Sequence, residues 1–185
     1  MPLILIYIRA HFEIMALLEK QLYVKKSLLP EAGKGLFTKV FIPKGTRIVE
    51  YKGEKLTWKE VEKMSEDRNG YVFFFNNQHV IDAWNYKDAL ARYANDAKGI
   101  ARVEGLKNNS EYVTVKKKCY IEATRDIPKG SEIFVGYGGE YWQAICYNIR
   151  LEQKRQETKD KKAGKKNGHK ILLPHDHISK RKKVK

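Results

Sequence analysis

The hydrophobic positions of this chain gather in short runs of β-branched and aromatic residues, which glycine, proline or asparagine interrupts. Such runs are typical of strands. They predict strands within residues 22–30, from about residue 36, and within 46–51, 71–75, 79–83, 112–115, 119–123 and 131–137. Helical spacing is rarer, and it predicts a helix from the capping box Thr57–Glu60 to about residue 67, a short helix within 89–97, and a helical face of Trp142, Ile145 and Ile149. The pattern therefore predicts a mostly-β domain with minor α.

One four-residue segment, I-P-K-G, occurs twice, at residues 42–45 and 127–130. Proline fixes φ and glycine tolerates positive φ, so each copy predicts a tight turn. Each turn leads into an apolar strand, and these strands end at Tyr51 and Tyr137, beside glycines. The two tyrosines are either packing residues or the polar groups of a narrow channel.

The positive charge of the chain is concentrated at its C-terminal end. The formal net charge is +15, and fourteen Lys and Arg against four Asp and Glu place +10 of it between Arg150 and Lys185. We therefore expect an N-terminal extension at 1–21, a folded domain at 22–147, and a basic helical or disordered tail at 148–185.

Two further features bear on the compartment. The cysteines are Cys119 and Cys146, with no C-x-x-C pair, which argues against a zinc module and a disulfide framework. We therefore expect no metal and a reducing compartment, either cytoplasmic or nuclear (nucleoid), rather than secretion. The apolar residues 2–8 fall short of the ~20 that a spanning helix needs, so we expect no membrane partner. Residues 1–14 are interpreted as an extension of unknown meaning, or as a start upstream of the true one at Met15.

Five segments, taken in order, resemble a SET domain, the fold of most protein-lysine methyltransferases. They are G-K-G-L-F at 33–37, I-V-E-Y-K-G-E at 48–54, V-I-D-A at 80–83, A-R-Y-A-N-D at 91–96 and E-I-F-V-G-Y-G at 132–138. Each match alone is weak, and their order makes the resemblance specific. It covers roughly residues 23–142, about two-thirds of the chain.

The resemblance implies a β-clip-like SET fold of several small sheets that transfers methyl from S-adenosylmethionine to the ε-amine of a lysine in a protein substrate, most commonly a histone. By position, Tyr137 matches the catalytic tyrosine of the family, and Tyr51 a second tyrosine at the same channel. A phenol suits this place because it is polar and stays uncharged below about pH 10. The implied cofactor contacts are Lys34, Gly35, Leu36, Tyr71, Asn95, Asp96, Tyr137 and Trp142. The implied lysine channel is lined by Tyr51, Tyr112 and Val135.

The number of methyl groups added follows from the same resemblance. Many members have Phe or Tyr two residues before the catalytic tyrosine, and a hydroxyl there helps to hold a water that blocks further methylation. Val135 occupies that place here, and strand alternation would turn it to the same face as Tyr137. Because Tyr112 matches a position from which some members supply the hydroxyl, we expect mainly monomethylation.

The chain departs from the family pattern at several places. Asp96 replaces the usual histidine after Asn95, residues 98–107 are inserted, and Asn109 best matches the asparagine of the family's P-N pair. No Cys-rich post-SET zinc motif is present, so Trp142 and the helix after it are expected to close the channel.

Less specific interpretations stand beside these. Lys34 can be a solvated turn lysine, Asp96 an ordinary loop residue and Trp142 a core residue. The alternative function is an inactive SET-like binding module that reaches nucleic acid through the lysine clusters of the tail at 159–170 and 180–185. The tail can also be simply solvated. Retention of Tyr137 and Asn95 favours an enzyme, because inactive domains often lose one of them.

Overall fold

The computed structural model describes residues 17–64, 70–100 and 102–162. The chain divides into two compact units, the first ending at Gly136 and the second beginning at Tyr137. The predictions for residues 1–14 and for the lysine clusters beyond residue 162 lie outside the described residues. Within the described ranges, no helix is both long enough and apolar enough to cross a membrane.

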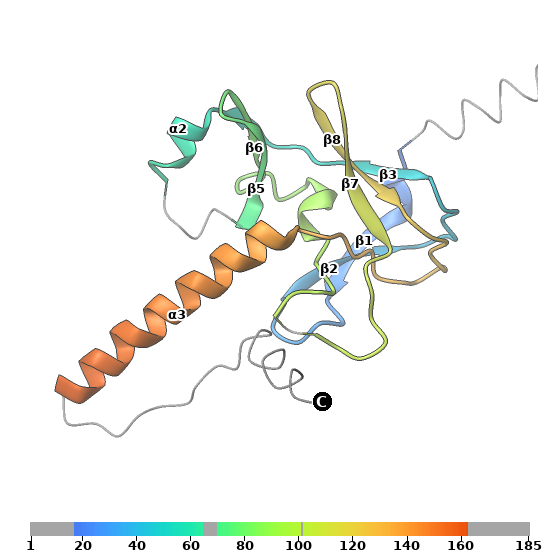
Figure 1. The fold of residues 1–185 in the computed structure, drawn as a ribbon. Coiled ribbons are helices and arrows are strands. Elements are labelled where there is room, and N and C mark those ends of the chain that lie inside the picture. Colours follow the sequence, from blue (N-terminus) through green and yellow to red (C-terminus); the bar gives the residue numbers. More distant parts are fainter. Residues whose placement is uncertain (1–16, 65–69, 101, 163–185) are drawn as a thin grey trace, which may run out of the picture. The chain divides into compact units, whose positions relative to one another are not determined.

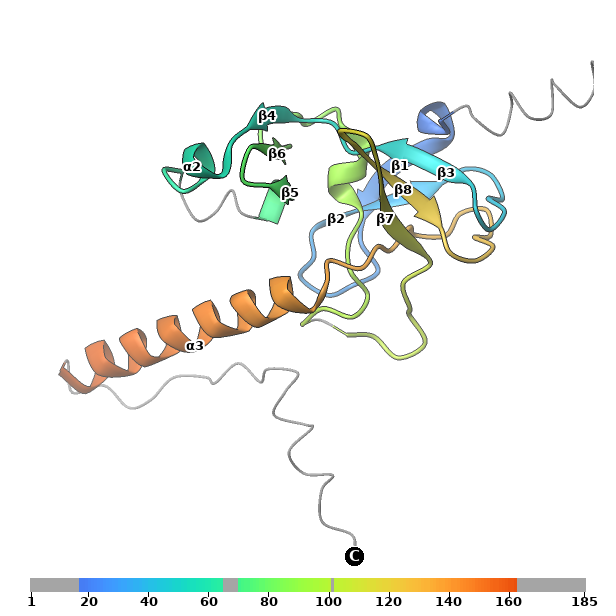
Figure 2. The same cartoon turned by 45° about the horizontal axis from the view of Figure 1, so that its top comes forward.

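Three small antiparallel sheets form the first unit (Figure 1). In strand order they are β1 (Leu22–Lys26) with β2 (Lys34–Thr38); β3 (Arg47–Glu50), β8 (Lys118–Ala123) and β7 (Ser110–Val115); and β4 (Glu54–Leu56), β6 (His79–Asp82) and β5 (Val72–Asn76). The helical segments between them are η1 (Glu19–Gln21), α2 (Trp58–Val61) and η3 (Leu90–Tyr93). Figure 2 shows that the second and third sheets are separate, with the chain passing from β3 to β4 between them. The prediction of a mostly-β fold with minor α and several small sheets is confirmed.

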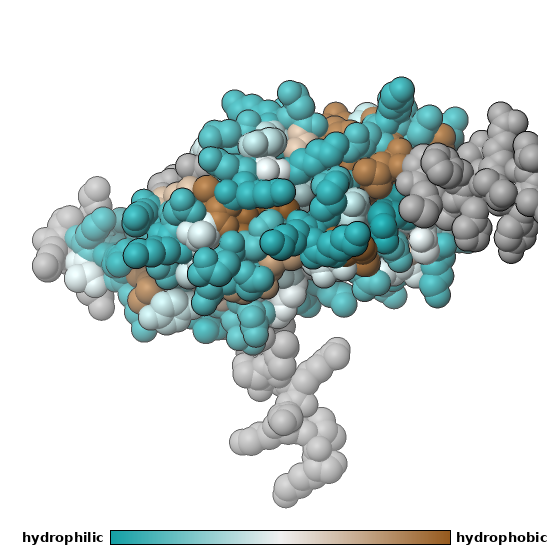
Figure 3. Space-filling model, turned by 90° about the horizontal axis from the view of Figure 1, so that it is seen from above, coloured by the Kyte–Doolittle hydropathy of each residue, from teal (hydrophilic) through white to brown (hydrophobic). Residues whose placement is uncertain are grey.

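The core follows the two-residue period of the strands. In β8 the side chains of Cys119, Ile121 and Ala123 are buried, whereas the residues between them are half-buried. Because successive side chains of a strand point to opposite faces, one face of β8 packs inward. Most of the surface visible in Figure 3 is hydrophilic, with apolar residues gathered in a few places.

The capping box predicted at Thr57 is present. The backbone N–H and the hydroxyl of Thr57 both donate to the Glu60 carboxylate, each at 2.7 Å. The α-helix ends at Val61 and is followed by a turn at residues 62–63 and a bend at residue 64. The remainder of the predicted helix, residues 65–67, lies outside the described residues.

The two I-P-K-G segments form equivalent turns and pair with each other. Gly45 and Gly130 have φ values of +80° and +82°, which glycine adopts without a steric penalty. In each turn the residue after glycine donates its N–H to the proline carbonyl at 3.2 Å. The backbones of Ile42 and Ile127 exchange two hydrogen bonds, of 2.9 and 2.8 Å. We call this Ile42–Ile127 pairing the turn bridge.

The second turn does not lead into a regular strand, contrary to the prediction for residues 131–137. Glu132, Phe134 and Val135 form isolated bridges with three separate segments, so no single neighbour pairs with enough of this segment to form a ladder. Ile133, Phe134 and Val135 are all buried, and the segment therefore has no exposed face. The expected alignment of Val135 with Tyr137, which belongs to the second unit, stays a prediction.

Candidate active site

Three aromatic rings from two sheets meet in one cluster. Tyr51 follows β3, Phe73 lies in β5 and Tyr112 lies in β7. The ring centroid of Tyr51 is 6.0 Å from that of Phe73 and 5.9 Å from that of Tyr112, and Phe73 and Tyr112 are 5.1 Å apart. These separations are those of edge-to-face and tilted aromatic contacts. Tyr51 and Tyr112, both predicted to line the lysine channel, are therefore neighbours.

The hydroxyl of Tyr51 is held in a fixed position. It donates to the carbonyl oxygen of Tyr71 at 2.9 Å, and only 5% of the residue is exposed. Burial, followed by the nearby Cys119, raises the pKa of Tyr51 well above its ordinary value of about 10. The hydroxyl is therefore uncharged at neutral pH and acts as a polar group of the cluster rather than as a base.

Tyr71 connects this cluster to a cation. Its ring packs against Trp84 at 5.4 Å, and the guanidinium carbon of Arg92 lies 4.2 Å from the ring centroid. Arg92 also lies 5.3 Å from the ring of Tyr93. The positive charge of Arg92 opposes the rise in the pKa of Tyr51 and acts on it more strongly than the negative charge of Asp82.

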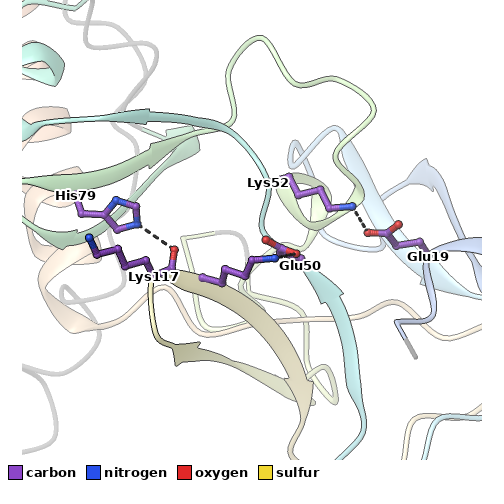
Figure 4. Close-up of polar contacts among 6 residues, drawn as sticks. Glu19, Glu50, Lys52, His79 and Lys117 are labelled. Carbon is purple, nitrogen blue, oxygen red and sulfur yellow. Dashed lines mark hydrogen bonds and ion pairs between the residues drawn. The ribbon is translucent and has the colours of Figure 1, made fainter. Parts of the chain in front are cut away.

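Surface polar contacts link the strands beside the cluster (Figure 4). Nε2 of His79, in β6, lies 3.1 Å from the carbonyl oxygen of Lys117, in the turn between β7 and β8, and this contact joins the second and third sheets. Lys52 pairs with Glu19 at 2.7 Å. These contacts are exposed, so each adds little stability.

A second group of predicted site residues gathers around Asn95. Its Nδ2 donates to the carbonyl oxygen of Lys34 at 3.0 Å, to Oγ of Ser27 at 3.2 Å and to Oε1 of Glu132 at 3.2 Å. A Cβ atom added at Gly35 would collide with the Glu132 carboxylate. The predicted cofactor segment 34–36 and Asn95 are therefore adjacent, with the Lys34 side chain exposed and Leu36 fully buried.

Asp96 closes its own loop. The buried carboxylate accepts hydrogen bonds from the N–H of Lys98 at 2.8 Å and from Nδ2 of Asn108 at 2.9 Å. Oδ1 of Asn108 in turn accepts the N–H of Ala97 at 2.8 Å. This geometry favours the interpretation of Asp96 as an ordinary loop residue, and its role toward a cofactor stays a prediction.

Val135 and Asn109 lie between the two groups. The N–H of Val135 donates to the Asn95 carbonyl at 2.8 Å, and Val135 forms a bridge with Ser110 at the start of β7. The Asn109 side chain donates to the carbonyl of Glu132 at 2.8 Å and accepts the N–H of Phe134 at 2.9 Å. The bridge partner of Val135, Ser110, precedes Tyr112 by two residues in β7.

Tyr137 and Trp142 belong to the second unit, at the start of α3 (Gly139–Lys162). With Tyr141 they form a ring cluster, in which Tyr137 stacks on Trp142 at 5.8 Å and meets Tyr141 edge-on at 5.0 Å. The helical face predicted after Glu140 is present, because Trp142, Ile145 and Ile149 are all half-buried.

Comparison with known proteins identifies the family. The sequence model of the SET domain matches residues 33–138. The chain belongs to the SET-domain family. The histone-lysine N-methyltransferase 2D proteins of human and mouse are each 36% identical to it over 113 residues, a match that covers 57% of this chain and 2% of each relative. The chain thus spans a very small part of these relatives.

Among solved structures, the methyltransferase domain of human PR domain-containing protein 2 is similar, with 21% identity and a TM-score of 0.48. That match covers 64% of this chain and 78% of the other. The matched SET region includes every predicted site residue except Trp142. The predicted family and fold are confirmed, while the roles of the individual residues stay predictions.

Sequence reasoning missed several residues of these two groups. Phe73 was assigned only to a strand, although it contacts both Tyr51 and Tyr112. Glu132 and Ser27 were given no role, although they hold Asn95. The one available signal was an acidic residue beside the apolar run I-F-V at 133–135.

Proposed function

We propose that this SET-domain protein is a protein-lysine N-methyltransferase, which transfers a methyl group from S-adenosylmethionine to the ε-amine of a lysine. The observation that carries the proposal is the cluster of Tyr51, Phe73 and Tyr112, where a buried uncharged hydroxyl lies among aromatic rings. The names of the two relatives support a histone as the substrate class, and hence action in the nucleus.

The cluster suits the chemistry of a lysine acceptor. At neutral pH about 99.9% of free lysine is ammonium, given its pKa near 10.4, and an ammonium nitrogen has no lone pair to attack with. Dry surroundings and a nearby cation both lower the pKa of an amine. Burial at Tyr51 supplies the first condition, and Arg92, stacked on Tyr71, supplies the second. Aromatic faces still attract the cationic side chain as it enters.

The residues around Asn95 fit the cofactor, which supplies a methyl group on a positively charged sulfur. That molecule also carries an ammonium group and an adenine amine, and both need acceptors. Oδ1 of Asn95 accepts no hydrogen bond from the described part of the chain, and the Glu132 carboxylate lies on the other side of the same amide. Lys34, Gly35, Leu36, Asn95 and Asp96 would hold the cofactor, and Tyr71, Tyr137 and Trp142 are assigned to it by the sequence resemblance alone.

Replacing Tyr137 tests the proposal. With labelled cofactor and a panel of histones, wild type should incorporate methyl groups, and Tyr137→Phe should lose at least about tenfold in turnover, or ~1.4 kcal/mol of barrier. Cofactor affinity should barely change, because the substitution removes a single hydroxyl at the amine. Tyr141→Phe, in the same ring cluster, is the matched control and should keep its turnover. A Tyr137→Phe variant with more than a tenth of wild-type turnover would refute the assignment.

The competing function is a non-catalytic module tethered to nucleic acid. Its motivation is the basic tail, most of which lies beyond the described residues. The presence of both Tyr137 and Asn95 argues for an active enzyme instead. The same labelling experiment separates the two, since such a module would transfer no methyl group to any histone.

A further inference from the structure

We infer that Glu132 is a positioning residue, whose buried carboxylate holds the side-chain amide of Asn95 with its oxygen turned toward the proposed cofactor. This inference rests on the proposed function, because it assigns Asn95 to cofactor binding. The geometry that carries it lies entirely in the first unit of the chain.

Glu132 carries a carboxylate in the buried interior, next to an apolar run of the chain. Only 2% of it is exposed, and the three residues that follow it are buried and apolar. Burying a carboxylate is costly unless hydrogen bonds compensate it. Oε1 accepts the hydroxyl of Ser27 at 2.7 Å and Nδ2 of Asn95 at 3.2 Å, and Oε2 accepts the N–H of Leu28 at 2.7 Å. Both oxygens therefore act as acceptors.

These contacts leave one orientation for the Asn95 amide. The three partners of Nδ2 are oxygen atoms of Glu132, Ser27 and Lys34. A flipped amide would direct Oδ1 at the Lys34 carbonyl and the Glu132 carboxylate, which can only accept hydrogen bonds. Oδ1 of Asn95 is therefore turned away from the Glu132 carboxylate. In this orientation it can accept a hydrogen bond from a ligand that carries N–H groups.

The chain makes room for this carboxylate at a second position. A Cβ atom at residue 35 would overlap Oε1 of Glu132, so only glycine leaves the space. Gly35 lies between Lys34, whose carbonyl also accepts a hydrogen bond from Asn95, and Leu36, whose carbonyl accepts the N–H of Ile133. The start of β2 and the Glu132 carboxylate therefore both fix the side chain of Asn95.

Glu132→Gln changes this arrangement with almost no change in volume. The N–H of Leu28 cannot turn, because it is backbone, so the glutamine carbonyl should stay with it and the new NH2 group should face Asn95. Two donors would then oppose each other, and Asn95 would turn its oxygen inward or move away. We expect the affinity for S-adenosylhomocysteine to fall at least tenfold.

Isothermal titration calorimetry of the full chain with S-adenosylhomocysteine, at a temperature where each variant is folded by circular dichroism, measures this effect. Asn95→Ala should also bind weakly, and the double variant should bind no more weakly than Asn95→Ala, because Glu132 acts through Asn95. Thr38→Val, which removes another buried hydroxyl, is the control and should lose stability with unchanged affinity. Full affinity in Glu132→Gln, or multiplying effects in the double variant, would overturn the inference.

A measurement on wild type keeps the test open if Glu132→Gln does not fold. In ¹⁵N-correlated NMR spectra, the side-chain amide signals of Asn95 should shift when S-adenosylhomocysteine is added. Unshifted signals at saturation would overturn the inference and leave the proposed function standing. A wild-type chain that binds no S-adenosylhomocysteine would instead overturn the proposed function, and this inference with it.

Discussion

Replacing Tyr51 with phenylalanine removes a single buried hydroxyl and keeps the ring that contacts Phe73 and Tyr112. The hydroxyl donates to the carbonyl of Tyr71, which also accepts the N–H of Ala83 at 2.9 Å. Since that carbonyl keeps one partner, the substitution loses a hydrogen bond without leaving an unpaired acceptor. We expect a loss of about 1 kcal/mol, which lowers the unfolding midpoint by roughly 2–4 °C in a chain of this size.

The stability difference should also depend on pH. Burial raises the pKa of Tyr51 in the folded protein above the value of about 10 in the unfolded chain. The protonated phenol is therefore favoured by folding, and its contribution is complete below about pH 10 and is lost as the pH rises beyond it. The stability advantage of wild type over Tyr51→Phe should be constant from pH 7 to 9 and shrink above pH 10.

Thermal unfolding followed by circular dichroism at several pH values measures both effects. Tyr93→Phe is the matched control, because the Tyr93 hydroxyl donates to the Lys87 carbonyl at 2.9 Å in an exposed position, and its loss should cost less. Methyl transfer by Tyr51→Phe should fall less than tenfold, because this hydroxyl is already engaged with Tyr71. A variant as stable as wild type at pH 7, or an advantage that persists unchanged to pH 11, would refute the reasoning.

Three further predictions concern other parts of the chain. Cys119 is fully buried, and burial raises its pKa to about 12. Iodoacetamide at pH 8 should therefore leave it unmodified in the native protein. Peptide mapping that finds Cys119 alkylated as fast as in the unfolded chain would contradict this. Wild type should yield mainly monomethyl-lysine and Tyr112→Phe more di- and trimethyl-lysine by mass spectrometry, and trimethyl product from wild type would end this hypothesis. A chain truncated from residue 160 should still methylate a short peptide, while the nucleic-acid affinity of the full chain should fall steeply with salt. A folded but inactive truncation, or salt-independent binding, would argue against assigning catalysis to the domain and nucleic-acid binding to the tail.

Local features of the fold were predictable from sequence, and long-range ones were not. The turns at Gly45 and Gly130 and the capping box at Thr57 depend on residues a few positions apart, and all three are present. The segment after Gly130 was predicted as a strand because its residues are apolar, yet its partners come from three distant segments. No local pattern encodes that choice of partners.

The same distinction applies to the candidate site. The resemblance to SET domains named Tyr51, Tyr112 and Asn95, and the structure brings the two tyrosines into contact. Glu132 begins one of the matching segments, but it was given no role because its partner Ser27 lies 105 residues away in the chain. A buried carboxylate is recognised only when its donors are known, and those donors come from separate elements.

The turn bridge between Ile42 and Ile127 makes residues 43–126 a closed loop, within which both three-stranded sheets lie. Once such a loop is closed, the chain entropy depends only on the logarithm of its length, and doubling it costs about 0.6 kcal/mol. The inserted residues 98–107 lengthen it by roughly a tenth, at a cost near 0.1 kcal/mol. A fold closed in this way can lengthen one of its connections at almost no entropic penalty, and here Val103 and Leu106 of the longer connection pack against the buried Leu29, Ala97 and Phe134.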